Sequence, residues 1–447
     1  MLAAAAGAAL AAGLGCTTGP SGLQGSPPAG AAATAPPPAD TAAGFCMVGD
    51  FEPCRAIWLG YDPGHAVLTA QLAAALQPHV DLRVLVTDAA QLDDVRALLS
   101  RAGVDADRVL WHVERQAIFF VRDAAVFTRG PPQQLGLVDF RWSHYGLAAW
   151  CKRRHASEPA LASRCAAAAD ENSREELDRS MARLAGARIN SSSLYMEGGG
   201  IENNGAGVLL VSQTLAQQRN PGVPKAQLQA AFEALPGVKK LIWLADGLAS
   251  DPHLRSTITG NYVAWGTGGH SDEFVRFADA RTVLLAWPDD ADVAAHPVAR
   301  LNRLRMQRNF DILAAATDAG PGGGRPFRII KLPVPRSVER RIFLSAAADG
   351  RFSADWTADF FPPGERRREG QPVIQLASSS YLNFVVANGV VVVPGYEAHG
   401  TPRVVEQRLR SLLQQAFPGR QIVFVDALGA NWVGGGPHCA TLNEPLV

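Results

Sequence analysis

Short apolar runs alternate with segments of helical periodicity from about residue 55 to the end of the sequence. The apolar runs are rich in Val, Ile and aromatic residues, which is typical of buried β-strands. They predict strands at 55–61, 82–87, 117–121, 207–212, 239–245, 282–288, 328–334, 389–394 and 421–426. Apolar residues that recur every three or four positions predict helices at 65–77, 88–102, 175–187, 225–235, 298–316 and 402–417. The alternation indicates an α/β fold with a single core over residues 45–447, and no internal repeat is obvious.

The first 44 residues lack both patterns. Residues 1–16 form an apolar Ala, Gly and Leu run that fits the apolar region of a secretory signal, although no basic residues precede it. Leu14, Gly15 and Cys16 resemble a bacterial lipobox, with Gly13 standing where Leu is usual. We expect an exported protein, with Cys16 as the candidate lipidation site and membrane anchor. The alternative is a low-complexity tail on a cytoplasmic protein.

Residues 17–44 consist mainly of Pro, Ala, Gly, Ser and Thr. Such a segment cannot bury enough apolar surface to offset the entropy of ordering it, so we expect a disordered tether. The catalytic domain is therefore expected at 45–447.

Composition excludes one class of partner. Of the 447 residues 47% are hydrophobic, enough for a large core, and 42 basic residues balance 42 acidic ones. A net charge of zero without a Lys/Arg stripe argues against a nucleic-acid partner.

Six cysteines occur in the chain. Four of them form two local pairs, Cys46 with Cys54 and Cys151 with Cys165. In an exported protein such pairs are plausible disulfides, whereas in a reducing compartment they would be four small buried residues. Cys439 lies apart behind three glycines, and we expect it to stay unpaired.

Four segments place polar residues where predicted strands end or turn. They contain Arg122 and Asp123, Glu197 before three glycines with Glu202 shortly after, His270 and Asp272, and Gly436 with His438 and Cys439. Each segment alone has an ordinary explanation as a turn or a helix cap.

Together the four segments indicate a specific chemistry. A cysteine with a histidine elsewhere in the chain supplies a nucleophile and an acid/base. Several carboxylates beside them indicate a cationic substrate, because buried carboxylates need a partner charge. The forked donors of a guanidinium fit carboxylates in pairs. The residues by themselves therefore predict a thiol enzyme that acts on a guanidinium group.

The same segments resemble the ordered motifs of the agmatine deiminase and porphyromonad-type peptidylarginine deiminase family, within the guanidine-modifying (pentein) superfamily. The resemblance covers about residues 50–447. It rests on Arg122-Asp123; Glu197-Gly198-Gly199 with Ile201 and Gly205; His270-Ser271-Asp272 with Arg276-Phe277; Tyr381-Leu382-Asn383-Phe384, Ala387-Asn388-Gly389 and Val393-Pro394; and Gly434-Gly435-Gly436-Pro437-His438-Cys439-Ala440-Thr441 with Pro445.

This resemblance implies a five-module, pseudo-symmetric α/β propeller with a central site and no cofactor or metal. It implies that Cys439 attacks the guanidinium carbon and that His270 protonates the departing ammonia and then activates water. It also implies that Asp123 and Asp272 bind the guanidinium nitrogens and that Glu197 supports them or the histidine. Further substrate contacts are expected from Arg122, Gly436 and Asn388.

The chain departs from the pattern usual for deiminases of free agmatine. The departures are Ala124-Ala125-Val126, Glu202-Asn203-Asn204 and Gly268-Gly269 before His270, with extra residues from about 252 to 265. They affect the far end of the substrate more than the guanidinium, and with export they favour a peptide or another non-agmatine guanidine. Agmatine, peptidyl-arginine and free arginine stay open, as does the oligomeric state.

Three other hypotheses remain. The first is amidino transfer to an amine through the same covalent intermediate, and the second is an exported lipoprotein that binds cations without catalysis. The third is a metal hydrolase that uses His270, Asp272, His438 and Cys439. The third is disfavoured because neighbours such as His438 and Cys439 point apart in an extended segment.

Overall fold

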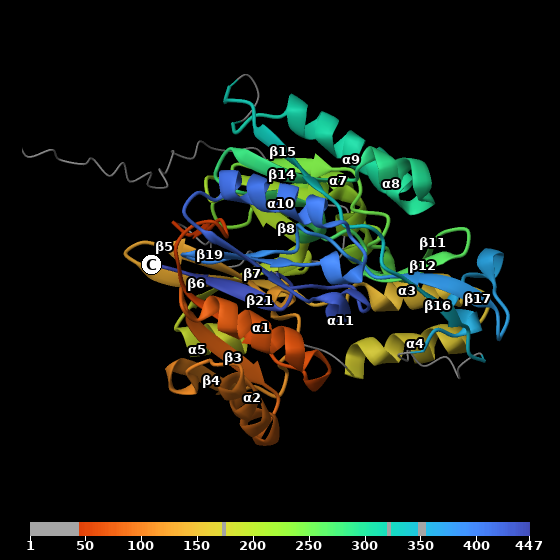
Figure 1. Cartoon of the computed structure of the whole chain (residues 1–447), viewed down its shortest axis with the longest axis horizontal. Helices are drawn as coiled ribbons and strands as arrows, with labels where there is room; N and C mark the ends of the chain where they lie inside the picture. Colours follow the sequence, from red (N-terminus) through yellow and green to blue (C-terminus); the bar gives the residue numbers. More distant parts are fainter. Residues whose placement is uncertain (1–43, 172–175, 320–322, 347–354) are drawn as a thin grey trace, which may run out of the picture.

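The computed structural model of the protein describes residues 44–171, 176–319, 323–346 and 355–447 (Figure 1). Strands and helices alternate along it, so the predicted α/β class is confirmed. No sheet of the described residues closes on itself. Within these ranges none of the helices has the length and apolarity needed to cross a bilayer. Cys16, the expected signal and the expected tether up to residue 43 lie outside the described residues.

Five sheets repeat one pattern, in which a first strand pairs antiparallel with a second, and the second pairs parallel with a third. We call each set of three strands a unit. The units are β5 (Val126–Gly130), β6 (Gln134–Arg141) and β7 (Arg188–Tyr195); β8 (Ile201–Asn203), β9 (Val208–Ser212) and β10 (Lys240–Leu244); β13 (Val275–Phe277), β14 (Thr282–Trp287) and β15 (Arg328–Pro333); β18 (Val385–Val386), β19 (Val390–Pro394) and β20 (Gln421–Val425); and β21 (Thr441–Pro445), β2 (Cys54–Gly60) and β3 (Asp81–Val86). Strands β1 (Cys46–Met47) and β4 (Val109–Val113) extend two of these sheets.

Helices connect the second and third strands, because a parallel pair needs a crossover. They are α1 (Ala66–Leu76), α6 (Gln213–Arg219) with α7 (Lys225–Glu233), α8 (Asp290–Ala295) with α9 (Pro297–Ala315), α10 (Arg403–Ala416), and α3 (Leu147–Arg154), α4 (Pro159–Glu171) and α5 (Leu177–Ala185). Helix α2 (Ala89–Arg101) joins β3 to β4, and the short α11 (Leu428–Asn431) follows β20. Central strands such as β9 and β19 are buried along their whole length, which explains their uninterrupted apolar sequences.

Of the nine predicted strands eight are present, and all six predicted helices are present, with ends shifted by at most two residues. The prediction of a strand at 117–121 is wrong. The backbone there crosses directly over β2, since a Cβ added to Gly60 would lie 2.1 Å from the Ile118 carbonyl oxygen. The ring of Phe119 stacks on His65 with 4.2 Å between centroids. Residues 117–121 are apolar because they pack against β2 and His65, although they pair with none of the described strands.

A sixth sheet lies outside the five units. It contains β11 (His253–Thr259), β12 (Tyr262–Thr267), β17 (Pro372–Leu376) and β16 (Glu339–Phe343), in that order. Figure 1 places this sheet beside α3 and α4. The contact is direct, because Arg154 Nη2 of α3 donates to the Arg255 carbonyl of β11 at 2.8 Å. Residues 252–265, which the sequence marks as extra, thus belong to a separate layer.

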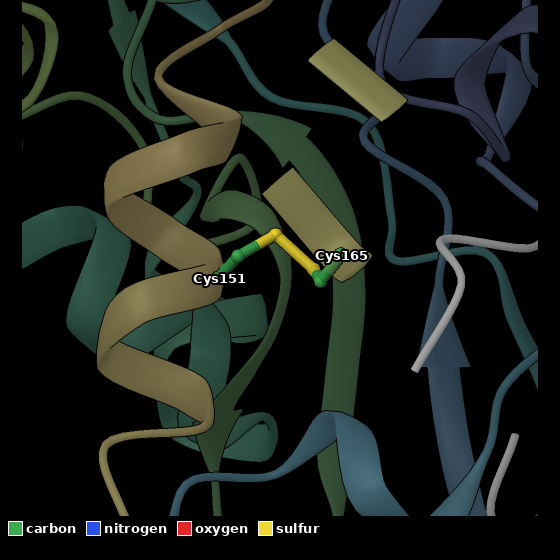
Figure 2. Close-up of a disulfide and its surroundings, with 2 residues drawn as sticks. All are labelled: Cys151 and Cys165. Atoms are coloured by element: carbon green, nitrogen blue, oxygen red, sulfur yellow. A yellow bond between two sulfur atoms is a disulfide. The ribbon is translucent and has the colours of Figure 1, made fainter. Parts of the chain in front are cut away.

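The two expected disulfides have different outcomes. Cys151 of α3 and Cys165 of α4 are bonded, with Cα atoms 5.7 Å apart (Figure 2). The pairing of Cys46 with Cys54 is wrong, because Cys54 carries a free, buried thiol. Its Sγ lies 3.6 Å from Asn388 Oδ1, so the thiol takes part in a polar contact instead.

Candidate active site

The candidate catalytic residues occupy the same position in all five units, namely the loop directly before the first strand. Three of these loops contain 3-10 turns, η3 (Val121–Ala124), η4 (Gly198–Gly200) and η5 (Ser271–Glu273). Every side chain concerned is at most 2% exposed, so the site is enclosed by protein. The residues are Asp123 before β5, Glu197 before β8, His270 and Asp272 before β13, Asn383 before β18 and Cys439 before β21.

Cys439 is held by an amide and faces carboxylates. Asn383 Nδ2 donates to its Sγ at 3.0 Å, and Asp272 Oδ2 lies 3.6 Å from the same sulfur. Burial raises the pKa of the thiol well above its usual value, and the charges of Asp272, Glu273 and Asp123 raise it further. The thiol is therefore neutral in the empty site, and a cation that enters the site would favour the thiolate.

Asp123 and Asp272 each have one carboxylate oxygen held by a hydrogen bond from the protein. The hydroxyl of Tyr145 donates to Asp123 Oδ2 at 2.7 Å, and His438 Nδ1 lies 2.7 Å from Asp272 Oδ2. The other oxygen of each carboxylate, Oδ1, is buried and has no hydrogen-bond partner among the described residues. His270 Nδ1 is in the same condition and lies 3.7 Å from Asp123 Oδ1 and 3.9 Å from Asp272 Oδ1.

Gly199 packs closely against these three side chains. A Cβ at this position would lie 2.8 Å from His270 Nδ1, 2.9 Å from Asp272 Oδ2 and 3.1 Å from Asp123 Oδ1. No side chain fits at such distances, so glycine is needed here for the three side chains to approach one another. Buried polar atoms without partners are costly, and a planar cation with several N–H donors would satisfy both carboxylates at once.

His270 and Glu197 form a buried charged pair. His270 Nε2 lies 3.2 Å from Glu197 Oε2, and Arg219 Nε donates to both oxygens of Glu197 at 2.8 and 2.9 Å. Burial opposes the charge on Glu197, but Arg219 and His270 outweigh it and lower the pKa to about 2. Burial also opposes the charge on His270, but Asp123, Glu197 and Asp272 outweigh it and raise the pKa to about 9. At neutral pH the empty site thus holds an imidazolium that can donate a proton.

The backbone of His270 is fixed by Asp251. Asp251 Oδ2 accepts from the backbone N–H of Gly269 at 3.0 Å and of His270 at 3.2 Å, and from the hydroxyl of Thr267 at 2.6 Å. His270 and Asp272 reach the same site because His270 caps the 3-10 turn η5 and Asp272 lies within it.

Three predicted substrate-binding residues have different surroundings. The guanidinium of Arg122 donates to Asp50, to Asn443 and to the Thr441 carbonyl oxygen. Asn388 bonds to the backbone of Cys54 and to the His79 carbonyl, so the structure does not bring it to Cys439. Gly436 packs against Asn383, where a Cβ would lie 2.7 Å from Oδ1. It therefore shapes the loop that presents Cys439.

The structure adds four residues to which the sequence assigned no role in a guanidine deiminase, although His438 was named in the metal-hydrolase alternative. Asn383, His438 and Glu273 lie inside or beside the motifs, so their position was a usable signal. Asn383 Nδ2 donates to Glu273 Oε1 at 2.8 Å, and burial and Asp272 raise the pKa of Glu273 well above its usual value. Tyr145 lies between β6 and α3, and nothing in its local sequence marks it.

Asp272, Glu273 and Cys439 offer ligand atoms within 4.8 Å of one another, close enough to surround a metal ion. Asn383 Nδ2 already donates to two of these atoms. The donor set fits a guanidinium with a thiol nucleophile better than a metal ion, which would need this amide to turn away.

Part of this sequence is similar to the sequences of known proteins. Agmatine deiminase of Pseudomonas fluorescens (strain SBW25) is 29% identical over 260 residues, which are 58% of this chain and 59% of that protein. Agmatine deiminase of Medicago truncatula is 29% identical over 262 residues, with the same two shares. The chain thus aligns with about three-fifths of the length of these relatives.

The fold has solved counterparts. The structure of agmatine deiminase of Enterococcus faecalis matches 91% of this chain and 98% of its own, with a TM-score of 0.65 and 21% identity. A sequence model of the Porphyromonas-type peptidyl-arginine deiminases matches residues 47–445. Because that match spans nearly the whole described domain, the chain belongs to the Porphyromonas-type peptidyl-arginine deiminase family.

Proposed function

We propose that the protein is a guanidine deiminase that converts a guanidinium substrate to the ureido product and ammonia. One observation carries the proposal. Asp123 Oδ1, Asp272 Oδ1 and His270 Nδ1 lie close together beside Gly199, buried and with no hydrogen-bond partner among the described residues, and Cys439 Sγ lies 3.6 Å from Asp272. Family membership and the agmatine deiminases among its relatives support it.

Binding would activate the nucleophile. The two carboxylates hold the guanidinium edge, and its positive charge lowers the pKa of the Cys439 thiol, which the same carboxylates had raised. The thiol proton passes to a neighbouring carboxylate such as Asp272, and the sulfur forms a bond to the guanidinium carbon. Asn383 keeps the sulfur aimed at the carbon through its 3.0 Å hydrogen bond.

His270 would then act twice. Its imidazolium donates a proton to one amino nitrogen, the C–N bond breaks, and ammonia leaves a thiouronium on Cys439. The neutral imidazole, held by Glu197, takes a proton from water, and the water oxygen attacks the same carbon. The C–S bond breaks as the hydroxyl proton of the intermediate passes to the sulfur, which releases the ureido product and restores the thiol and the imidazolium. Asp272 gives the proton that it took from Cys439 to the released ammonia. Guanidinium and water are consumed, and the ureido compound and ammonium are formed.

Ammonia release from agmatine, free arginine, and peptides with internal or C-terminal arginine tests the activity and separates the substrates. We expect release from at least one member without an added amine, and none from Cys439→Ala with unchanged circular dichroism. Release that depends on an amine acceptor would favour amidino transfer. Tight binding without turnover would favour the non-catalytic reading.

We further propose that the five units are modules of a propeller around this site. The support is that each unit contributes its site residue from the same loop, before its first strand. An experimental structure that places the five first strands around a common axis would agree, whereas a layered arrangement of the units would not.

Export and anchoring through Cys16 remain our proposal for the location. The Cys151–Cys165 disulfide supports it, because such bonds persist in oxidising compartments. Incorporation of a labelled fatty acid in a bacterial host, present in the full chain and lost in Cys16→Ser, is the expected result. Equal labelling of both, or of neither, would refute anchoring at Cys16.

A further inference from the structure

The loop between β6 and α3 has an unusual backbone. His144, Tyr145 and Gly146 have φ values of 48°, 57° and 73°, so two non-glycine residues in succession adopt the left-handed conformation. Leu254, the neighbour of His253 on β11, has a φ of 51°. Such conformations persist only where surrounding contacts determine them, and they gather at functional sites.

Contacts from β11 hold this loop against the site. His253 Nε2 lies 2.6 Å from the Tyr145 carbonyl oxygen, and Arg153 Nη2 donates to His253 Nδ1 at 3.0 Å. Since Nδ1 accepts from the arginine, the proton of the neutral imidazole is on Nε2 and points at the carbonyl. The sixth sheet therefore fixes the backbone of Tyr145 from outside the five units.

The side chain of Tyr145 reaches the candidate active site. Its hydroxyl donates to Asp123 Oδ2 at 2.7 Å. Its ring lies 6.2 Å from the His270 ring between centroids, and the Arg219 guanidinium lies 5.7 Å from the ring centroid. No other hydrogen bond to the carboxylate oxygens of Asp123 is present among the described residues, so Tyr145 alone fixes its rotation.

We propose that Tyr145 is a positioning residue that turns the Asp123 carboxylate so that Oδ1 faces the guanidinium. It does for Asp123 what His438 does for Asp272, since each occupies one carboxylate oxygen and leaves the other for the substrate. The inference rests on the proposed function. It also gives the sixth sheet and α3 a role in substrate binding, through the backbone that they hold.

The charges around Asp123 give this role a distinct pH signature. The groups that face it are His270 and Asp272 from η5, Glu197 before η4, Cys439 before β21, and Tyr145 itself. Burial raises the pKa of Asp123 to about 6 against the opposing charge of His270, and the Tyr145 hydrogen bond acts to lower it. Removal of that hydroxyl raises the pKa of Asp123 further. As the pH falls, Asp123 would then become protonated, and the cation would be released, at a higher pH than in the wild type.

The test compares Tyr145→Phe with Tyr195→Phe on the substrate that the wild type turns over. Tyr195 ends β7, and its ring lies under the Arg141 guanidinium at 4.3 Å. For Tyr145→Phe we expect kcat/KM to fall about tenfold, mainly through KM, because a hydrogen bond to a charged group is lost. The acid limb of kcat/KM should move to higher pH, and Tyr195→Phe should match the wild type.

A Tyr145→Phe enzyme with wild-type KM and acid limb would overturn the inference. If that variant does not fold, His253→Ala takes its place and should raise KM in the same direction. An unchanged KM in His253→Ala would then be the contrary result. A wild type that releases no ammonia from any guanidine refutes the proposed function itself, and this inference with it.

Discussion

Asn383 Nδ2 lies 3.0 Å from Cys439 Sγ and is the amide that also reaches Glu273. Through Oδ1 the same side chain accepts from the backbone N–H of His438 at 2.9 Å. One amide thus fixes both the nucleophile and the loop that carries it, from a different unit of the fold. This contact orients the Cys439 thiol, because the glycines before it allow a close backbone approach but cannot hold the side chain in place.

Replacement of Asn383 should therefore disable the nucleophile. Asn383→Ala removes the donor to sulfur and leaves the His438 N–H without its acceptor, and we expect kcat to fall at least tenfold. Asn383→Asp should lower kcat more, because a new negative charge would raise the thiol pKa further. Steady-state kinetics on folded variants checks both, and equal kcat values for wild type and Asn383→Asp would contradict the assignment.

The free enzyme should have an unreactive thiol. Burial and three carboxylates keep Cys439 protonated, so iodoacetamide should inactivate the enzyme slowly at pH 7. The rate of alkylation should rise in the presence of a small, unreactive guanidinium ion that binds to Asp123 and Asp272. Fast alkylation at pH 7 in the absence of any cation would show that the thiolate exists before substrate binds.

The pH profile of kcat/KM should be bell-shaped, with limbs near the pKa values of Asp123, about 6, and His270, about 9. Asp123 must be ionised to bind the cation, and His270 must be protonated to release ammonia. Glu197→Gln removes a negative charge that raises both pKa values, so both limbs should move to lower pH. For Tyr145→Phe, in contrast, only the acid limb of kcat/KM should move, and it should move to higher pH.

Gly199 should tolerate no side chain. Gly199→Ala places a methyl group 2.8 Å from His270 Nδ1, beside the carboxylates that would bind the substrate, and we expect loss of turnover with retained secondary structure. Gly429→Ala is the matched control, because a Cβ there meets nothing within 4 Å. A Gly199→Ala enzyme with normal KM would place the substrate elsewhere.

The disulfide should stabilise the α3–α4 excursion. It joins residues 14 apart, and closing a loop of that length contributes about 3 kcal/mol to stability. A double Cys151→Ser, Cys165→Ser variant should show a lower free energy of unfolding by roughly that amount in chemical denaturation. It should also show a raised KM, because α3 follows directly on Tyr145. If the double variant has the wild-type free energy of unfolding and the wild-type KM, the disulfide neither stabilises this region nor influences the site.

The sequence predicted eight of the 21 strands and six of the 11 α-helices in the described residues, namely those whose signals are local. Buried strands such as β9 and β19 read as continuous Val and Leu runs, and α9 and α10 show clear periodicity. The run 117–121 misled because burial alone makes a segment apolar. The fivefold repeat of strand pairing was invisible in the sequence, because the units share a backbone pattern while their side chains differ.

The site was predictable to the extent that its residues lie in motifs. Asp123, Glu197, His270, Asp272 and Cys439 all meet, as expected from their residue types. Tyr145 could not be found in this way, because its role depends on a left-handed backbone and on a contact with β11 that is 108 residues away in sequence. Asn388 was chosen from a motif, yet its amide is bound to Cys54 and His79.

The central claim is a covalent thiouronium on Cys439, and mass spectrometry of the acid-quenched reaction tests it most directly. During turnover of the substrate that gives the fastest ammonia release, the peptide that contains Cys439 should gain the mass of the substrate less ammonia. A His270→Gln variant should form the adduct much more slowly and release no ammonia at steady state, because no imidazolium protonates the leaving nitrogen and no imidazole activates water. Steady ammonia release with no adduct on this peptide, and undiminished release in Cys439→Ala, would contradict the account.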